Sequence, residues 1–366
     1  MAKKRPTKKK KPSEQSVRKP SSRQIAKLDR EILSLINARA ELTAKRDNLD
    51  GDSRVSDDKE AFEHIVSQNK GPLDEVAVRA IFREVLSGSH AVGHPTSAAY
   101  LGPEFTYSHL AAIQRFGQSV DLVPVGTIAS VFEEVERGHA EFGIVPIENS
   151  TDGRVADALD CLARSSVKIC GEIPLAIHHC LLGLGVRGDI EQIYSKAQPL
   201  SQCRNWLSKH MPDVRLREVA STGEAARKAS QEANAAAIAS EQSAANHGLK
   251  VLARKIEDNP DNVTRFAVIG TQGGARTGKD KTSLVFEIGH KPGALADAMG
   301  IFKRHRLNMT WIESFPVSGQ RGTYLFFIEF QGHASELRAR RAMAALEKKA
   351  SRLTVLGSYA QAEPIG

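Results

Sequence analysis

The chain lacks any apolar run that approaches the roughly 18 residues of a membrane-spanning helix, so we expect no membrane partner. It is also poor in cysteine. The four cysteines, Cys161, Cys170, Cys180 and Cys203, form no CxxC pair, which favours reduced residues in a cytoplasmic setting. With 366 residues the chain is long for a single core, so we expect two or three domains.

The basic charge of the chain is confined to one end. The formal net charge is +8, and residues 1–20 hold nine Lys or Arg against one acid, Glu14. The rest is neutral, with 42 of the 51 bases and 42 of the 43 acids. The tail has few apolar residues to fold with, no aromatic residues among its charges and no apolar segment of a signal peptide. We interpret it as a disordered extension or an over-called start, and we expect no nucleic-acid partner.

Three helices are expected in front of the central part of the chain. Apolar residues at helical spacing predict a long helix over residues 22–47, and shorter helices over about 57–69 and 74–87. Three helices in so short a segment bury little core, so the sequence predicts an all-helical dimer.

Residues 98–275 alternate strand-like and helix-like segments. Strands are expected at 120–125 and 142–147, and helices at 128–137 and 154–164, an alternation typical of a mainly parallel α/β sheet. Residues 172–253 have room for a second lobe, so two crossings of the chain would create a hinged cleft. After a glycine-containing loop, residues 282–361 follow the order βαββαβ.

Three polar phrases stand beside apolar runs in the central segment. They are Gly102-Pro103-Glu104-Phe105-Thr106-Tyr107-Ser108, Glu148-Asn149-Ser150-Thr151-Asp152-Gly153 and Asn262-Val263-Thr264-Arg265-Phe266. Ligands of open α/β sheets lie at strand ends where polar loops converge. Hydroxyls, an amide and one arginine suit a small polyanion whose reaction needs positioning and proton donation. No metal and no cofactor are expected.

These phrases resemble the signatures of the prephenate dehydratase family. The resemblance covers about residues 98–275 and implies a two-lobed, periplasmic-binding-protein-like fold with the substrate in the cleft. It also implies that Thr264 donates to the leaving hydroxyl, that Arg265 binds a carboxylate and that Phe266 packs beneath the triplet. Further contacts are implied for Asn149, Ser150, Thr106, Gln198 and Gln202.

Several of these roles stay open at this point. Glu148 either orients Arg265 or acts as an acid. Asn149, Ser150 and Thr106 also fit helix capping. The segment around Gln198 carries Lys196 where the family usually has histidine, and Phe105 replaces a usual glycine.

Residues 21–94 resemble the all-helical chorismate mutase often fused in front of this dehydratase. Arg39, Lys59, Glu60 and Ser89 match its site, whereas Ser22, Asp50 and Gly93 stand where the family has a cation or a polar partner. An active mutase and a dimerisation arm are both compatible with this pattern.

The βαββαβ segment resembles a regulatory ACT domain, which implies a phenylalanine effector site at a subunit interface of a homodimer or homotetramer. Phe315 replaces an arginine of the family motif. The residues implied in that site are Gly293, Ala294, Leu295, Asn308, Glu313 and Ser314.

The sequence therefore predicts a cytoplasmic prephenate dehydratase of phenylalanine biosynthesis, a carbon–oxygen lyase that converts prephenate to phenylpyruvate, carbon dioxide and water. A chorismate mutase activity, which makes prephenate from chorismate, is the possible second function. The alternatives are a non-catalytic amino-acid sensor and a nucleic-acid-binding protein. Arogenate in place of prephenate as substrate also stays open.

Overall fold

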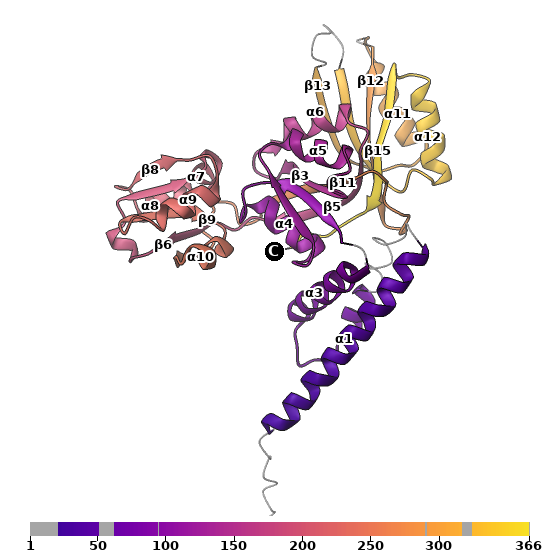
Figure 1. The fold of residues 1–366 in the computed structure, drawn as a ribbon. Coiled ribbons are helices and arrows are strands. Elements are labelled where there is room, and N and C mark those ends of the chain that lie inside the picture. Colours follow the sequence, from indigo (N-terminus) through magenta and orange to yellow (C-terminus); the bar gives the residue numbers. More distant parts are fainter. Residues whose placement is uncertain (1–20, 51–61, 94, 290, 317–323, 366) are drawn as a thin grey trace, which may run out of the picture.

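The computed structural model describes residues 21–50, 62–93, 95–289, 291–316 and 324–365. Two helices project from a body made of two α/β lobes and a C-terminal βαββαβ unit (Figure 1). This confirms the predicted fold class. None of the helices in these ranges is long and apolar enough to cross a membrane.

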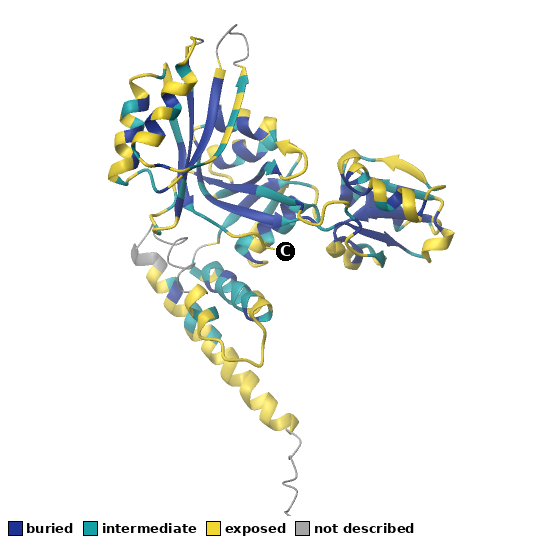
Figure 2. Cartoon of the chain, turned by 180° about the vertical axis from the view of Figure 1, so that it is seen from behind, coloured by how far each residue is buried: buried dark blue, intermediate teal, exposed yellow. Residues whose placement is uncertain are grey.

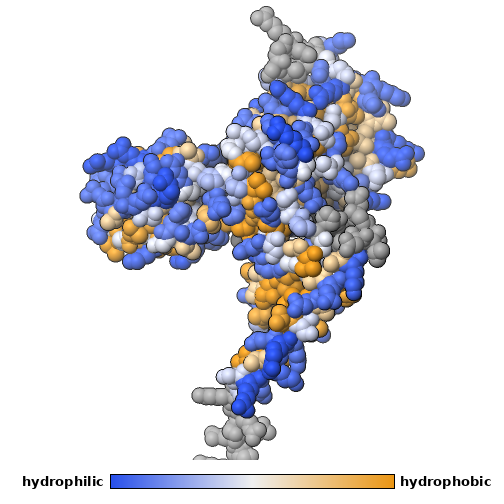
Figure 3. Space-filling model, viewed as in Figure 1, coloured by the Kyte–Doolittle hydropathy of each residue, from blue (hydrophilic) through white to orange (hydrophobic). Residues whose placement is uncertain are grey.

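The N-terminal helices are α1 (Ser22–Asp50) and α3 (Glu75–Gly93), with a helical turn at 62–67 between them. Helix α3 is longer than predicted and α1 agrees closely. Helix α1 buries little of its apolar row, which is largely exposed in Figure 2. Apolar side chains gather over the same two helices in the space-filling view of Figure 3. The exposed row consists of Ile25, Leu28, Ile32, Leu33, Leu35 and Leu42.

The first lobe is built on a sheet with the order β2-β1-β3-β11-β5, and the short β4 pairs with β3. The predicted mainly parallel sheet is wrong in one respect. Strands β1, β2 and β3 are parallel, but β11 runs antiparallel between β3 and β5, because the chain re-enters this sheet from the second lobe. The strands are β1 (Ser97–Leu101), β2 (Asp121–Val125), β3 (Phe142–Asn149), β4 (Gly153–Arg154), β5 (Lys168–Ala176) and β11 (Val263–Gly270), and the helices are α4 (Tyr107–Phe116), α5 (Ile128–Glu136) and α6 (Ala156–Arg164).

The second lobe confirms the predicted two-crossing connection. Residues 177–179 lead into it and residues 254–262 lead back. Its sheet has the order β10-β6-β9-β7-β8. The elements are β6 (Cys180–Gly183), a 3-10 turn (Arg187–Asp189), β7 (Gln192–Ser195), α7 (Ala197–Gln202), α8 (Arg204–His210), β8 (Arg215–Glu218), α9 (Thr222–Ala229), β9 (Ala235–Ala239), α10 (Glu241–His247) and β10 (Lys250–Ala253).

The C-terminal unit has an antiparallel sheet with the order β13-β14-β12-β15, and α11 and α12 pack together on one face. The opposite face shares a core with the first lobe, in which Phe327 and Leu356 contact the cluster of Ile147 and Ile169. Strand β15 approaches β5 so closely that a Cβ on Gly357 would meet the Ile169 carbonyl oxygen at 2.0 Å. The elements are β12 (Asp280–Ile288), α11 (Ala294–Arg304), β13 (Met309–Pro316), β14 (Tyr324–Gln331), α12 (Leu337–Glu347) and β15 (Arg352–Ala360).

Candidate active site

A cavity of about 570 Å³ lies between the two lobes. The first lobe contributes the ends of β1, β3 and β11, and the second lobe contributes the loop before α7 and the start of α9. Thr106, Asn149, Thr264 and Phe266 line it from one side, and Gln198 and Gln202 line it from the other side together with Lys196. The cleft expected from the two crossings therefore gathers residues of all three polar phrases.

Thr264 is held by Asn149 across two paired strands. The register of β11 on β3 places the two residues opposite each other. The Asn149 side-chain amide, which is buried, donates to the Thr264 Oγ1 at 2.8 Å and to the Asn262 Oδ1 at 3.0 Å. Because Thr264 accepts this bond, its own hydroxyl proton is not used in it. No acceptor for that proton is found in the described part of the chain, so the hydroxyl is free to donate into the cavity.

Asn149 does not cap the helix that follows. Its Oδ1 accepts from the backbone N–H groups of Thr151 and Asp152, and α6 begins after Val155, which makes no side-chain cap. The side chain thus fixes its own loop and Thr264 at once.

Asp152 joins the two lobes. Its Oδ2 accepts from the Nε2 of Gln202 at 2.7 Å and also from the Nε2 of Gln198. The Oε1 of Gln202 in turn lies 2.8 Å from the Nε2 of His179 and accepts from Asn262 at 3.3 Å. Burial lowers the pKa of His179 despite the hydrogen bond to Gln202, so the ring is neutral and donates from its Nε2. A continuous polar network therefore runs from the second lobe to Thr264.

Three helices begin at the rim of the cavity. Helices α4, α5 and α9 are capped by Thr106, Thr127 and Ser221, whose side chains accept from the backbone N–H groups of their own first turns. All three caps line the cavity. The structure confirms the capping alternative for Thr106, whose hydroxyl also donates to the Pro103 carbonyl oxygen at 3.0 Å. Positive helix ends favour anionic groups.

Lys196 is the one Lys or Arg side chain that lines this cavity within the described residues. It lies at the start of α7 and forms no ion pair with a described carboxylate. The residue that departs from the family histidine therefore brings a cation to the cleft.

Arg265 is not in the cavity, so the prediction that it binds a substrate carboxylate is corrected. Successive residues of a strand face opposite sides. Thr264 and Phe266 face the cleft, and Arg265 faces the C-terminal unit. Its guanidinium contacts Glu148 at 2.7 Å, Glu329 at 2.6 Å and Glu172 at 3.3 Å, and it lies over the Trp311 ring.

This cluster of charges is largely buried. The side chains of Glu172 and Glu329 are 1% and 0% exposed. Lys281 also pairs with Glu172, at 3.0 Å. Burial opposes the charge of Arg265, but Glu329, Tyr359 and Glu172 hold its pKa above the ordinary value. Two roles were left open for Glu148, to orient Arg265 or to act as an acid. The geometry fits the first role.

Ser150 lies outside the cavity as well. Its Oγ donates to the Asp261 carbonyl oxygen at 3.3 Å and accepts from the Val263 N–H at 2.9 Å. The side chain thus joins its loop to the start of β11. Phe266 is buried and lines the same cavity as Thr264.

The residues matched to the mutase are only partly described. Arg39 is half-buried on α1, and Ser89 is buried on α3, where its hydroxyl donates to the Val85 carbonyl oxygen at 2.6 Å. Lys59 and Glu60 lie outside the described residues.

The residues implied in effector binding fall into two groups within one chain. The pairing of Ile288 with Tyr324, and of Tyr324 with Pro316, brings the loop before Gly293 to the end of the sheet that holds Glu313 and Ser314. Ala294 and Leu295 start α11 there. Asn308 lies at the opposite end, where it donates to Gln331 at 3.2 Å.

Glu313 is engaged with the first lobe. Its carboxylate accepts from Arg154 at 2.9 Å, and the same guanidinium donates to the Ser314 carbonyl oxygen.

Sequence reasoning missed the roles of Lys196, Asp152 and His179. Strand alternation beside Thr264 was the available signal that Arg265 faces away from the cleft.

Comparison with known proteins shows the family to which this fold belongs. Residues 98–273 match the model of the family "Prephenate dehydratase". A crystal structure of a prephenate dehydratase from Arthrobacter aurescens in complex with L-Phe aligns with a TM-score of 0.68 at 34% identity, over 73% of this chain and 90% of that one. A prephenate dehydratase from Staphylococcus aureus aligns with a TM-score of 0.65 at 32% identity, over 72% of this chain and 100% of that one.

The likeness extends to the N-terminal helices. A bifunctional chorismate mutase/prephenate dehydratase of Pseudomonas aeruginosa is 42% identical over 350 residues, which are 92% of this chain and 96% of that protein. A relative of the same name from Aquifex aeolicus is 39% identical over 93% of this chain and 97% of its own length. The chain therefore belongs to the bifunctional chorismate mutase/prephenate dehydratase family.

Proposed function

We propose that the cavity between the lobes is the active site of a prephenate dehydratase of phenylalanine biosynthesis. The observation that carries this proposal is the hydrogen bond from Asn149 to Thr264, which leaves the threonine proton available to a ligand. Prephenate has two carboxylates and a ring hydroxyl. As carbon dioxide leaves, the electron pair of the broken C–C bond enters the ring, and the C–O bond breaks. Hydroxide takes up a proton to give water.

Thr264 acts on the leaving oxygen. A threonine hydroxyl is a weak acid, so its contribution is a hydrogen bond to the charge that develops on that oxygen in a site shielded from water. Asn149 fixes the position of the hydroxyl. Phe266 contributes apolar surface to the same cavity.

The two carboxylates of the substrate find complementary charge in the same cavity. Lys196 supplies a full positive charge from the second lobe. The beginnings of α4, α5 and α9 supply partial positive charge at the rim. Gln198 and Gln202, held by Asp152, are placed to donate or accept hydrogen bonds when the lobes close on the substrate.

Thr264→Ala tests this assignment. Loss of one donor to a developing oxyanion reduces kcat by roughly 10²–10³-fold, whereas Thr264→Ser retains the hydroxyl and most of the rate. Turnover is followed as phenylpyruvate formation from prephenate, with arogenate as a parallel substrate. Full turnover by Thr264→Ala would refute the catalytic role. Saturable amino-acid binding without any turnover by the unmodified chain would favour the sensor alternative.

We also propose that residues 21–94 form a chorismate mutase domain that works as a dimer, within a homodimeric or homotetrameric protein. The exposed apolar row of α1 supports this, because Ile25, Leu28 and Ile32 are each more than half exposed in one chain. Chorismate supplied alone should be consumed faster than in an enzyme-free control and end as phenylpyruvate. Loss no faster than the control would mean that the helices serve dimerisation only. Light scattering gives the oligomeric state.

Feedback by phenylalanine completes the proposal. Gly293 has a φ of +80° and precedes α11 without a side-chain cap, so backbone N–H groups are open to a carboxylate. Asn308 lies at the far end of the same sheet, which supports a site completed by a second copy of the chain. Inhibition of prephenate turnover by L-phenylalanine, and its loss in Gly293→Val, tests this part.

A further inference from the structure

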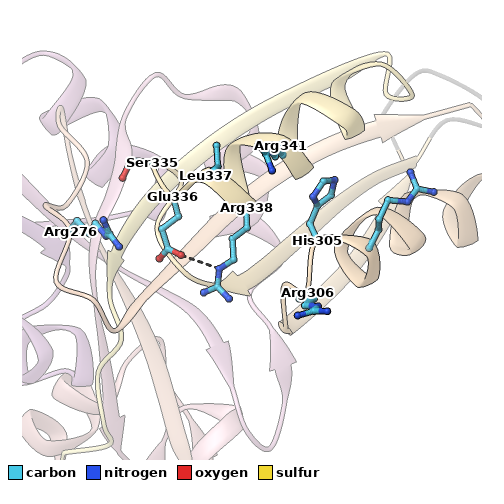
Figure 4. A pocket seen from close by; sticks show the side chains of 9 residues that line it. Arg276, His305, Arg306, Ser335, Glu336, Leu337, Arg338 and Arg341 are labelled. Carbon is cyan, nitrogen blue, oxygen red and sulfur yellow. Dashed lines mark hydrogen bonds and ion pairs between the residues drawn. The ribbon is translucent and has the colours of Figure 1, made fainter.

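A second concave surface lies on the C-terminal unit, away from the cleft and from Gly293. It is a groove of about 570 Å³ between the end of α11 and the beginning of α12. Among the residues that the structure describes, five arginines line it, and Glu336 is its one acidic residue. Figure 4 shows these side chains coming from the ends of two helices and from the loop that carries Arg276. The arginines are Arg276, Arg304, Arg306, Arg338 and Arg341.

Most of this positive charge is uncompensated. Glu336 pairs with Arg338 at 3.0 Å, and the pKa of Glu336 is lowered first by the backbone N–H of His333 and then by Arg338 and Arg276. No ion pair to a described carboxylate is formed by the remaining guanidiniums of Arg304, Arg306 and Arg341 or by that of Arg276. Four like charges around one hollow repel one another, and the repulsion is greatest at low ionic strength.

The local structure does not require arginine at these positions. Helix α12 has no acidic residue in its first turn, and the side chain of Glu336 does not cap the backbone N–H groups of that turn. Arg338 and Arg341 instead place cations near the positive end of that helix, where cations are disfavoured. Arg306 has a φ of +54°, a conformation for which glycine is the usual residue after a helix. An anion in the groove would offset the repulsion among these charges and their unfavourable position at the helix end.

We propose that this groove binds a compact polyanion that carries phosphoryl groups. Guanidinium groups bind phosphate oxygens bidentately, and four of them match three or four negative charges. Apart from His305, the described lining residues include no aromatic ring on which a base would stack. The expected ligand is therefore a small phosphorylated metabolite or polyphosphate rather than a nucleic acid.

Inorganic tripolyphosphate is the probe, titrated calorimetrically into the full chain in a low-salt buffer without other polyvalent anions. Arg306→Gln/Arg341→Gln should weaken binding at least tenfold, because each lost charged contact is worth about that factor. The matched control is Arg340→Gln/Lys348→Gln. It removes two charges that are exposed on or beside α12 and do not line the groove, and it should change binding less than about twofold. Retained prephenate turnover in both variants shows that they fold.

Several results would overturn the proposal. One is the absence of saturable binding, and another is equal weakening in the two double variants, which would indicate general attraction to a basic chain. Undiminished binding in Arg306→Gln/Arg341→Gln would assign the probe to the lysine-rich tail. Citrate binding as tight as that of tripolyphosphate would exclude phosphoryl recognition. Tighter binding of a DNA duplex that tripolyphosphate fails to displace would make the groove a nucleic-acid surface.

Discussion

Replacement of Arg265 by methionine distinguishes the two roles that sequence and structure give to this residue. A substrate-binding arginine would be needed for affinity, whereas the arginine seen here holds carboxylates from β3, β5 and β14 together. Methionine retains apolar contact with Trp311 and removes the charge. We therefore expect the main effect on stability.

The expected loss of stability depends on which partners each carboxylate keeps after the substitution. Glu148 is partly exposed and gains water, and Glu172 keeps Lys281 at 3.0 Å. Glu329 is fully buried, and its remaining partners in the described part of the chain are the hydroxyls of Ser283 and Tyr359. One buried carboxylate without its cation costs about 3–5 kcal/mol. At 2–4 °C per kcal/mol, the transition of the dehydratase and C-terminal parts should fall by roughly 6–20 °C.

Scanning calorimetry at pH 7.5 measures this shift, and steady-state kinetics on prephenate are recorded at a temperature where the variant is folded. The control is Arg254→Met. Arg254 makes a close ion pair with Glu241 at 2.7 Å, but both side chains are more than half exposed, so its loss should leave the transition nearly unchanged.

An unchanged transition together with a KM raised tens of fold would refute the structural role and restore the substrate-binding one.

Three further predictions concern the cleft. Lys196→Met should reduce kcat/KM for prephenate by roughly ten- to a hundredfold through the loss of one charged contact. Lys196→His should lose activity as pH rises through about 6.5. Kinetics equal to those of the unmodified chain at all pH values would exclude Lys196 from binding. Asp152→Ala should release Gln198 and Gln202 and thereby raise KM at least about tenfold. The melting transition of the first lobe should stay unchanged. Burial lowers the pKa of His109 and His179 in the folded chain. As pH falls, the unfolded chain therefore binds protons first, so the free energy of unfolding should have its full value above about pH 7 and decline as pH falls through 6.5. In urea titrations, His179→Gln should show a smaller decline than the unmodified chain.

Local pattern was sufficient for much of the fold. Apolar spacing predicted α1 and the βαββαβ order. These features depend on periodicity and on contacts between neighbours in the chain. The antiparallel insertion of β11 was not predictable in this way, because it depends on how the chain returns from the second lobe.

The sequence by itself determined the polar phrases that meet in the cleft, the family and the residue types of its site. Only the tertiary structure decided what each side chain faces. Thr264 and Arg265 are adjacent in sequence, yet one points to the cavity and the other to a buried cluster with Glu329, because a strand alternates its side chains between two environments. The arginine groove likewise exists only because α11 ends beside the start of α12, which brings residues from three separate segments to one surface.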